Sequence, residues 1–248
     1  MASKDKIQSS HIRRQLDEHG RKVRPEPSTD LMIAITGAGR EGSIGQAIME
    51  KFPNKIFATS HDVVQDDFDF YNYSALVMCH GYTYLDWIEN VPDEETFNII
   101  NVNLIGTIRM IKQFVNSTIK APHRKKIITI GSMAYDKVLN GSAAYCASKA
   151  GLNMFIRCAA WELAPKGFDV YIIHPSNVVN TPMTRETIKG LMRYRQINED
   201  EANAYWSAGS IREGCLTKDE IACYVEYIML NDTEYLSGSP IELAGGQR

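Results

Sequence analysis

An α/β fold built on a single doubly wound parallel sheet is the architecture that three features of the sequence predict. Short apolar runs alternate with longer segments of helical periodicity, which is the pattern of strands joined by helical crossovers. A glycine-rich turn follows directly after the first apolar run. The chain has 248 residues, 44% of them hydrophobic, which is enough to bury the core of one such domain.

The start of the chain differs from this pattern. Residues 1–29 are polar and end in the breaker-rich stretch 25–29, so we predict an N-terminal extension followed by a domain over residues 30–248. Acidic residues interrupt the lysines and arginines of the extension, which favours a solvated arm or a subunit contact over a nucleic-acid arm. We assign it no chemistry.

Charge, hydropathy and cysteine content exclude several classes of function. A formal net charge of −3 offers no field for nucleic acid or an anionic membrane. The sequence contains neither an apolar run long enough to span a membrane nor a secretion signal. The five cysteines are scattered without the pair spacing of a metal site, so we interpret them as reduced thiols. We therefore expect a cytoplasmic protein with no metal, nucleic-acid or membrane partner.

Six apolar runs are predicted as strands, and they are residues 31–35, 55–59, 75–79, 126–130, 170–174 and 240–243. If the second strand ends near Ser60, only about fourteen residues, 61–74, remain before the third run, whereas a helical crossover alone takes about 10 to 12 residues. We therefore expect an edge helix of the usual nucleotide-binding half to be missing, which shortens the segment between its second and fourth strands. A helix of three or more turns within these residues would contradict this expectation.

Two predicted helices are apolar on more than one face. They cover residues 96–118 and 145–164, with Ile100 and Ile105 on the first and Met154 and Trp161 on the second. Such helices pack against the sheet and against something else, for which a second subunit is the favoured candidate. We expect a homodimer or homotetramer, with a loosely covered helix in a monomer as the alternative.

The glycine-rich turn 36–45 lies between the first strand and the first helix, a placement typical of a dinucleotide phosphate site. Glycine lets the backbone approach a pyrophosphate closely, and the free N–H groups at a helix start favour its negative charge. Gly37, Arg40, Ser43 and Ile44 are therefore candidate cofactor-binding residues. A tight turn without a ligand is the alternative.

The end of the second strand predicts which cofactor would bind. NAD sites usually place a carboxylate about 20 residues after the glycine turn, on the adenosine ribose. Here Ser60 and His61 stand at that place, and with Arg40 they could accommodate a 2′-phosphate. Although Asp62 could still reach the ribose, we slightly favour NADP(H) over NAD(H).

Tyr145 and Lys149 are four positions apart, so on a helix they share one face. At ~6 Å and an effective dielectric of ~20, an ammonium favours a phenolate by ~2.8 kcal/mol, or ~2 pKa units. This predicts a pKa of ~8 for Tyr145 instead of ~10, which suits a general acid and base. The alternative is an aromatic stem beside a solvated lysine, because this spacing is common on helices.

With Asn103, Ser132 and the glycine turn, this pair resembles the short-chain dehydrogenase/reductase superfamily and its Rossmann-type fold. The likeness extends to residues 174–181, which are similar to the family's Pro-Gly segment, and to 237–246, which are similar to its C-terminal signature. The resemblance implies an NAD(P)-dependent oxidoreductase that transfers a hydride between a nicotinamide and a small carbonyl or alcohol substrate.

The resemblance also implies residue roles. Tyr145 would exchange a proton with the substrate oxygen, and Ser132 would hydrogen-bond that oxygen. Lys149 would hold the nicotinamide ribose, and Asn103 would help hold a water relay to it. Further cofactor contacts are implied for Gly81, Pro175, Val179 and Thr181. Residues 183–215 are expected to cover the pocket.

Departures from the family pattern leave alternatives open. Cys79, His80 and Gly81 stand where the family has Asn-Ala-Gly, and Ser176 replaces the glycine of the Pro-Gly segment. The glycine turn is spaced like that of the superfamily's enoyl reductases. An enoyl (C=C) reductase and a non-catalytic dinucleotide-sensing protein therefore remain alternatives, although Ser132 and the four-residue spacing favour carbonyl chemistry.

Overall fold

The computed structural model describes residues 32–52, 56–59, 67–120, 123–208 and 215–246. All of them belong to one compact unit, Leu31–Arg248. The predicted extension, residues 1–29, lies outside the described residues, so its role stays a prediction.

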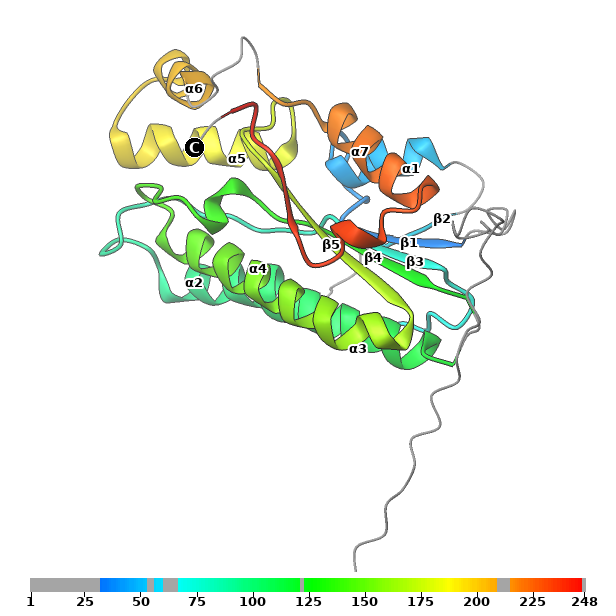
Figure 1. Cartoon of the computed structure of the whole chain (residues 1–248). Helices are drawn as coiled ribbons and strands as arrows, with labels where there is room; N and C mark the ends of the chain where they lie inside the picture. The colour runs from blue at the N-terminus through cyan, green and yellow to red at the C-terminus, as the bar shows by residue number, and fades with distance from the viewer. Residues whose placement is uncertain (1–31, 53–55, 60–66, 121–122, 209–214, 247–248) are drawn as a thin grey trace, which may run out of the picture. The chain divides into compact units, whose positions relative to one another are not determined.

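Six parallel strands form one sheet in the order β2-β1-β3-β4-β5-β6 (Figure 1). Each strand lies within two residues of a predicted run, which confirms the expected parallel sheet. The strands are β1 (Ile33–Thr36), β2 (Ile56–Thr59), β3 (Ala75–Met78), β4 (Lys125–Ile130), β5 (Phe168–Pro175) and β6 (Pro240–Leu243). Because β1 is flanked by β2 and β3, the chain reverses its direction of travel through the sheet there. In parallel sheets this switch point opens a crevice at the carboxyl ends of the strands.

Helices cover both faces of the sheet, as a doubly wound fold requires (Figure 1). On one face α1 (Ile44–Lys51) and α7 (Lys218–Leu230) share a buried apolar core with the strands. On the other face α3 (Thr107–Thr118) and α4 (Ala143–Leu163) do the same. Alternate side chains of each strand serve the two cores, since successive residues of a strand point to opposite faces.

Two further helices form a smaller cluster beside this sandwich. They are α5 (Pro182–Arg195) and α6 (Glu199–Ala208), which lie within the predicted covering segment 183–215. Ile188 and Leu191 of α5 pack with Ala202 of α6 and with Leu85. The cluster is separate from both cores of the sheet.

The segment before β3 is short, as expected. Residues 67–74, its described part, contain no helix, and residues 60–66 lie outside the described residues. Phe70 is buried against Phe114 of α3, with ring centroids 5.6 Å apart. We predicted that a crossover helix is missing from this segment. The aromatic contact covers part of the sheet in that region.

The predicted helix over residues 96–118 is not a continuous α-helix. It consists of α2 (Asp93–Ile100), a π-helical segment Asn101–Gly106 and then α3. The spacing of apolar residues does not reveal a π segment, because its wider turn contains one more residue than an α-helical turn but has the same kind of amino-acid composition. π segments occur frequently at functional sites, and this one contains Asn103.

Gly37 illustrates how tightly the turn after β1 packs on the end of β3. Its φ is +72°, and a Cβ there would lie 2.6 Å from the backbone nitrogen of His80. We expect Gly37→Ala to lower the free energy of unfolding by about 1 to 2 kcal/mol for the left-handed backbone and by about 1 to 3 kcal/mol more for the clash. Urea denaturation measures this loss.

Gly167→Ala is the matched control for this prediction. Gly167 also has a positive φ, +86°, but a Cβ there has nothing within 4 Å. Only the backbone term of about 1 to 2 kcal/mol should remain. Equal losses in the two variants would contradict the close approach at Gly37.

Candidate active site

The glycine turn starts helix α1 in the way a phosphate site requires. Ser43 caps the helix by accepting a hydrogen bond from the Gln46 backbone at 3.1 Å, and Ile44 is the first helical residue. The first N–H groups of a helix have no intrahelical partner, and they carry partial positive charge. Gly42 lies next to the 174–181 segment, where a Cβ would be 3.7 Å from the Asn180 carbonyl oxygen. These residues fit a dinucleotide phosphate at the switch point.

His80 joins the end of β3 to its neighbours, a role that sequence reasoning missed. Its Nδ1 lies 2.6 Å from Thr36 Oγ1, and its Nε2 lies 3.0 Å from Thr107 Oγ1. Burial and the nearby Lys149 lower the pKa of His80 to about 3, so the ring is neutral. The departure from Asn-Ala-Gly at residues 79–81 was the available signal for this bridge.

Asn103 uses its side chain to fix the loop after β3. Its Oδ1 accepts from the Tyr82 backbone at 2.8 Å, and its Nδ2 donates to the Tyr82 carbonyl at 3.0 Å. Nδ2 also donates to Ser148 Oγ at 3.0 Å, and Ser148 donates to the Tyr145 carbonyl at 2.7 Å. The π segment thus ties the loop to the helix that carries Tyr145.

Ser132 and Tyr145 meet at the end of β4. Ser132 precedes a 3-10 turn, Met133–Tyr135, and its Oγ accepts from the Ala134 backbone at 3.2 Å. The Ser132 hydroxyl is also close enough to the Tyr145 phenol, in the first turn of α4, to lower the pKa of that phenol. Two hydroxyl groups therefore lie together where a substrate oxygen could contact both.

The expected pKa of ~8 for Tyr145 is wrong for the protein without ligands. Burial raises the pKa of Tyr145 to about 12, although the hydrogen bond from Ser132 lowers it. The sequence argument considered the Lys149 charge and omitted desolvation, which disfavours a buried phenolate. The resting side chain is a neutral phenol.

Lys149 is buried beside Tyr145. Its Nζ lies 5.6 Å from the centre of the Tyr145 ring and donates to the Ile130 carbonyl at 3.4 Å. None of the ion pairs in the described part of the chain includes it. Burial lowers the pKa of Lys149 from 10.5 to about 8, while Cys79 raises it. A polar cofactor group beside this amine would replace part of its lost hydration.

The segment after β5 packs over the glycine turn. Pro175 ends β5, and the Val179 N–H donates to the Leu216 carbonyl at 3.0 Å. Asn180 adopts a left-handed φ of +59°, which asparagine tolerates better than most residues. Thr181 caps α5 by accepting from the Thr184 backbone at 3.1 Å. Pro175, Val179 and Thr181 thus approach the crevice from the β5 side.

Gly81 lies at the floor of this crevice. A Cβ there would be 3.0 Å from the Met183 methyl group and 3.6 Å from Asn103 Oδ1. Met183, the first residue of the predicted covering segment, therefore reaches over the end of β3. Glycine at this position leaves the space that a side chain would fill.

Of the residues expected to contact the adenosine part of the cofactor, the structure describes only Arg40. Arg40 lines a pocket of about 420 Å³ with the loop after β3 and with α5. Ser60, His61 and Asp62 lie outside the described residues. The structure therefore brings Asn103, Ser132, Tyr145 and Lys149 together and leaves the cofactor preference untested.

Among the described residues, no group of three or more His, Cys, Asp or Glu side chains could hold a metal ion. In the same part of the chain, every helix is too short or too polar to cross a membrane.

Comparison with known proteins identifies the family. Residues 62–191 match the family described as short chain dehydrogenase, which is more than half of the 248 residues. The chain belongs to this family. As a short-chain dehydrogenase/reductase, the protein is an NAD(P)-dependent oxidoreductase, and members of the family act on small carbonyl or alcohol substrates.

Its relatives include reductases of acyl chains. The chain is 29% identical to 3-oxoacyl-(acyl-carrier-protein) reductase FabG of Escherichia coli (strain K12) over 181 residues, 72% of this chain and 68% of that protein. It is 27% identical to (3R)-3-hydroxyacyl-CoA dehydrogenase of Rattus norvegicus over 174 residues, 70% of this chain and 62% of the rat protein. NAD+-bound xylitol dehydrogenase has the same fold, with a TM-score of 0.76 and 18% identity over 88% of this chain and 98% of that one.

Replacing Lys149 should show by how much its buried charge lowers the free energy of unfolding. Because the folded-state pKa of about 8 lies below 10.5, the unfolded chain binds more protons between these values, and stability rises with pH there. We expect Lys149→Met to raise the free energy of unfolding by up to roughly 3 kcal/mol at pH 7. The gain should shrink as pH approaches 10.5.

Urea denaturation at pH 7 and pH 10 compares the variant with the wild type. The control is Lys112→Met, because Lys112 is an exposed lysine of α3 and should show no such pH-dependent difference. A Lys149→Met protein that is less stable than the wild type at pH 7 would contradict the interpretation.

Proposed function

We propose that the protein reduces a carbonyl group to an alcohol, or runs the reverse reaction, with Tyr145 as general acid and base. The observation that carries this proposal is the Ser132 hydroxyl beside the Tyr145 phenol at the carboxyl end of β4, where it lowers the pKa of that phenol. A carbonyl oxygen in front of both groups would accept a hydrogen bond from each. Charge that develops on this oxygen would be stabilised by Ser132 and neutralised by a proton from Tyr145.

The protonation state of Tyr145 favours the reductive direction. With a pKa of about 12, the phenol is neutral at physiological pH and ready to donate its proton. The alcohol oxidation needs a phenolate, which burial disfavours. The positive charges of an oxidised nicotinamide and of the nearby Lys149 would favour the phenolate. Raised pH favours the phenolate as well, so the alcohol oxidation should be faster at raised pH.

Lys149 and the glycine turn support cofactor binding. Lys149 would hold the nicotinamide ribose, and the start of α1 would bind the pyrophosphate. A bound nicotinamide supplies or accepts the hydride. The family implies NAD(P). We propose NADP(H) as the preferred form because Arg40 in the glycine turn and His61 after β2 could supply positive charge to a 2′-phosphate.

The test compares the wild type with Tyr145→Phe. The substrates are aliphatic and aromatic ketones, a 3-oxoacyl thioester and a conjugated enoyl thioester, each with NADPH and with NADH. We expect the wild type to reduce one or more of the carbonyls, with a lower Michaelis constant for NADPH. Tyr145→Phe should lose about 10²- to 10⁴-fold in kcat while it still binds the cofactor. Fluorescence titration of NADPH checks that binding.

The alternatives give different results in the same assay. Reduction of the enoyl thioester with all carbonyls untouched would identify an enoyl reductase. NADPH binding without turnover in either protein would support the dinucleotide sensor. A lower Michaelis constant for NADH would overturn the cofactor preference alone.

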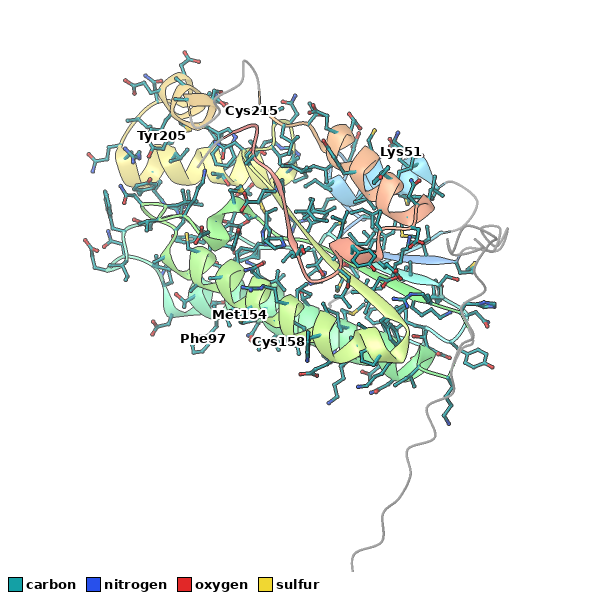
Figure 2. All side chains as sticks on the ribbon, in the orientation of Figure 1. Lys51, Phe97, Met154, Cys158, Tyr205 and Cys215 are labelled. Atoms are coloured by element: carbon teal, nitrogen blue, oxygen red, sulfur yellow. The ribbon has the colours of Figure 1, made fainter. Side chains whose placement is uncertain are left out.

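We also infer that the outer face of α2 and α4 packs against a second copy of the chain. Figure 2 shows Phe97, Met154 and Cys158 along these helices, and Trp161 continues the row. Phe97 and Met154 are 67% and 54% exposed, and Trp161 is 86% exposed. Apolar side chains gathered on one face are typical of a subunit contact, which supports a homodimer or homotetramer.

Charge placed on this face should disrupt the assembly. We expect the double variant Phe97→Lys and Met154→Lys to have a smaller mass than the wild type in size-exclusion chromatography with light scattering. Burying an unpaired ammonium in a subunit contact is strongly unfavourable. Tyr71→Lys is the control, because Tyr71 is exposed in the loop before β3. A monomeric wild type would refute the inference.

A further inference from the structure

His174 is a fully buried residue of β5 that touches the backbone of Ser132. The side chain has no exposed surface, and its Nδ1 lies 3.2 Å from the Ser132 nitrogen and 3.0 Å from the Ser132 carbonyl oxygen. On the other side of the ring, Nε2 lies 3.1 Å from Asn153 Oδ1 of α4. The imidazole therefore bridges the strand end that carries Ser132 and the helix that carries Tyr145.

The contact with Asn153 favours one tautomer of this ring. Asn153 Oδ1 can only accept, so Nε2 carries the proton that it donates there. Nδ1, which lies within reach of both the Ser132 N–H and the Ser132 carbonyl oxygen, then accepts from the N–H. Burial lowers the pKa of His174 to about 4, which keeps the ring neutral at physiological pH. In the protonated ring, Nδ1 would also carry a proton and could no longer accept from Ser132.

The surrounding residues are arranged to hold the imidazole. A Cβ at Gly131 would lie 2.5 Å from His174 Nδ1, so only glycine leaves room for the ring at this position. Tyr135 stacks on the other side, with ring centroids 4.0 Å apart, and its hydroxyl donates to Glu242 of β6. The ring is thus fixed from β4, β6 and the turn after Ser132.

We propose that His174 is a positioning residue that holds Ser132 in place through its backbone N–H, and that Asn153 selects the imidazole tautomer needed for this. The proposal rests on the proposed role of Ser132 in carbonyl reduction. His174 acts through Ser132, which lies between it and the substrate oxygen. No other use of this buried imidazole follows from its contacts.

A pair of His174 variants tests the acceptor. His174→Leu removes the group that accepts from Ser132, and His174→Asn returns an oxygen close to the position of Nδ1. We expect kcat to fall roughly tenfold in His174→Leu, the effect of one lost hydrogen bond, and to recover largely in His174→Asn. The Michaelis constant for NADPH should stay unchanged in both. Equal kcat in the leucine variant and the wild type would overturn the proposal.

Asn153→Asp tests the tautomer with a readout that packing alone would not move. A carboxylate beside Nε2 favours the imidazolium. Two charged groups already act on the ring, and their effects are opposite, because Lys149 lowers the pKa of His174 and Glu242 raises it. The pKa of His174 should therefore rise, and kcat should gain an acid limb in which activity falls as pH falls. Asn116→Asp, at an exposed position of α3, adds the same charge and should leave the profile unchanged.

Nuclear magnetic resonance separates this inference from the proposed function. In Asn153→Asp, the Ser132 amide signal should titrate with the same midpoint as the His174 ring. If the Ser132 amide signal does not change as the His174 ring titrates, the inference is overturned, whether or not the protein turns over a substrate. If the two titrate together but no carbonyl is reduced, the proposed function fails and the coupling stands.

Discussion

A buried ammonium group that has no carboxylate partner among the described residues is the constraint on which the site depends. Lys149 lies in α4 near the ends of β3 and β4. Burial lowers the pKa of His80 and the charge of Lys149 adds to this effect, whereas that charge opposes the burial that raises the pKa of Cys79. Burial lowers the pKa of Lys149 itself to about 8. Removing a charge from water is unfavourable, so the fold must supply the stability that this position loses. The two apolar cores on either side of the sheet provide it. A site under this kind of strain is expected where binding or chemistry is required.

The sequence predicted the sheet and the catalytic constellation for clear physical reasons. Strands buried on both faces are continuous apolar runs, so their positions followed to within two residues. Tyr145 and Lys149 shared a face because helix geometry depends only on spacing. Ser132 came beside them because parallel strands end at one edge of the sheet. Each of these features is local or follows from a regular repeat.

The features that were not predicted depend on three-dimensional surroundings. The pKa of Tyr145 is raised because burial, which spacing does not report, disfavours the phenolate. His80 and His174 are isolated in the sequence, and only the packed structure gives them partners. The π segment around Asn103 likewise has the composition of an ordinary helix. Long-range packing decides all of these.

The π segment has a consequence for how the protein tolerates insertions and deletions. In an α-helix each residue rotates the next by about 100°, so one residue more or less turns every later side chain to a new direction. The wider turn of the π segment accommodates one extra residue. Because of this residue, Asn103 faces the loop after β3 while Met110, Ile111 and Phe114 of α3 still face the sheet core. The length of this stretch therefore couples two faces of one helix. Insertion or deletion of a single residue here would misdirect either the core or the site.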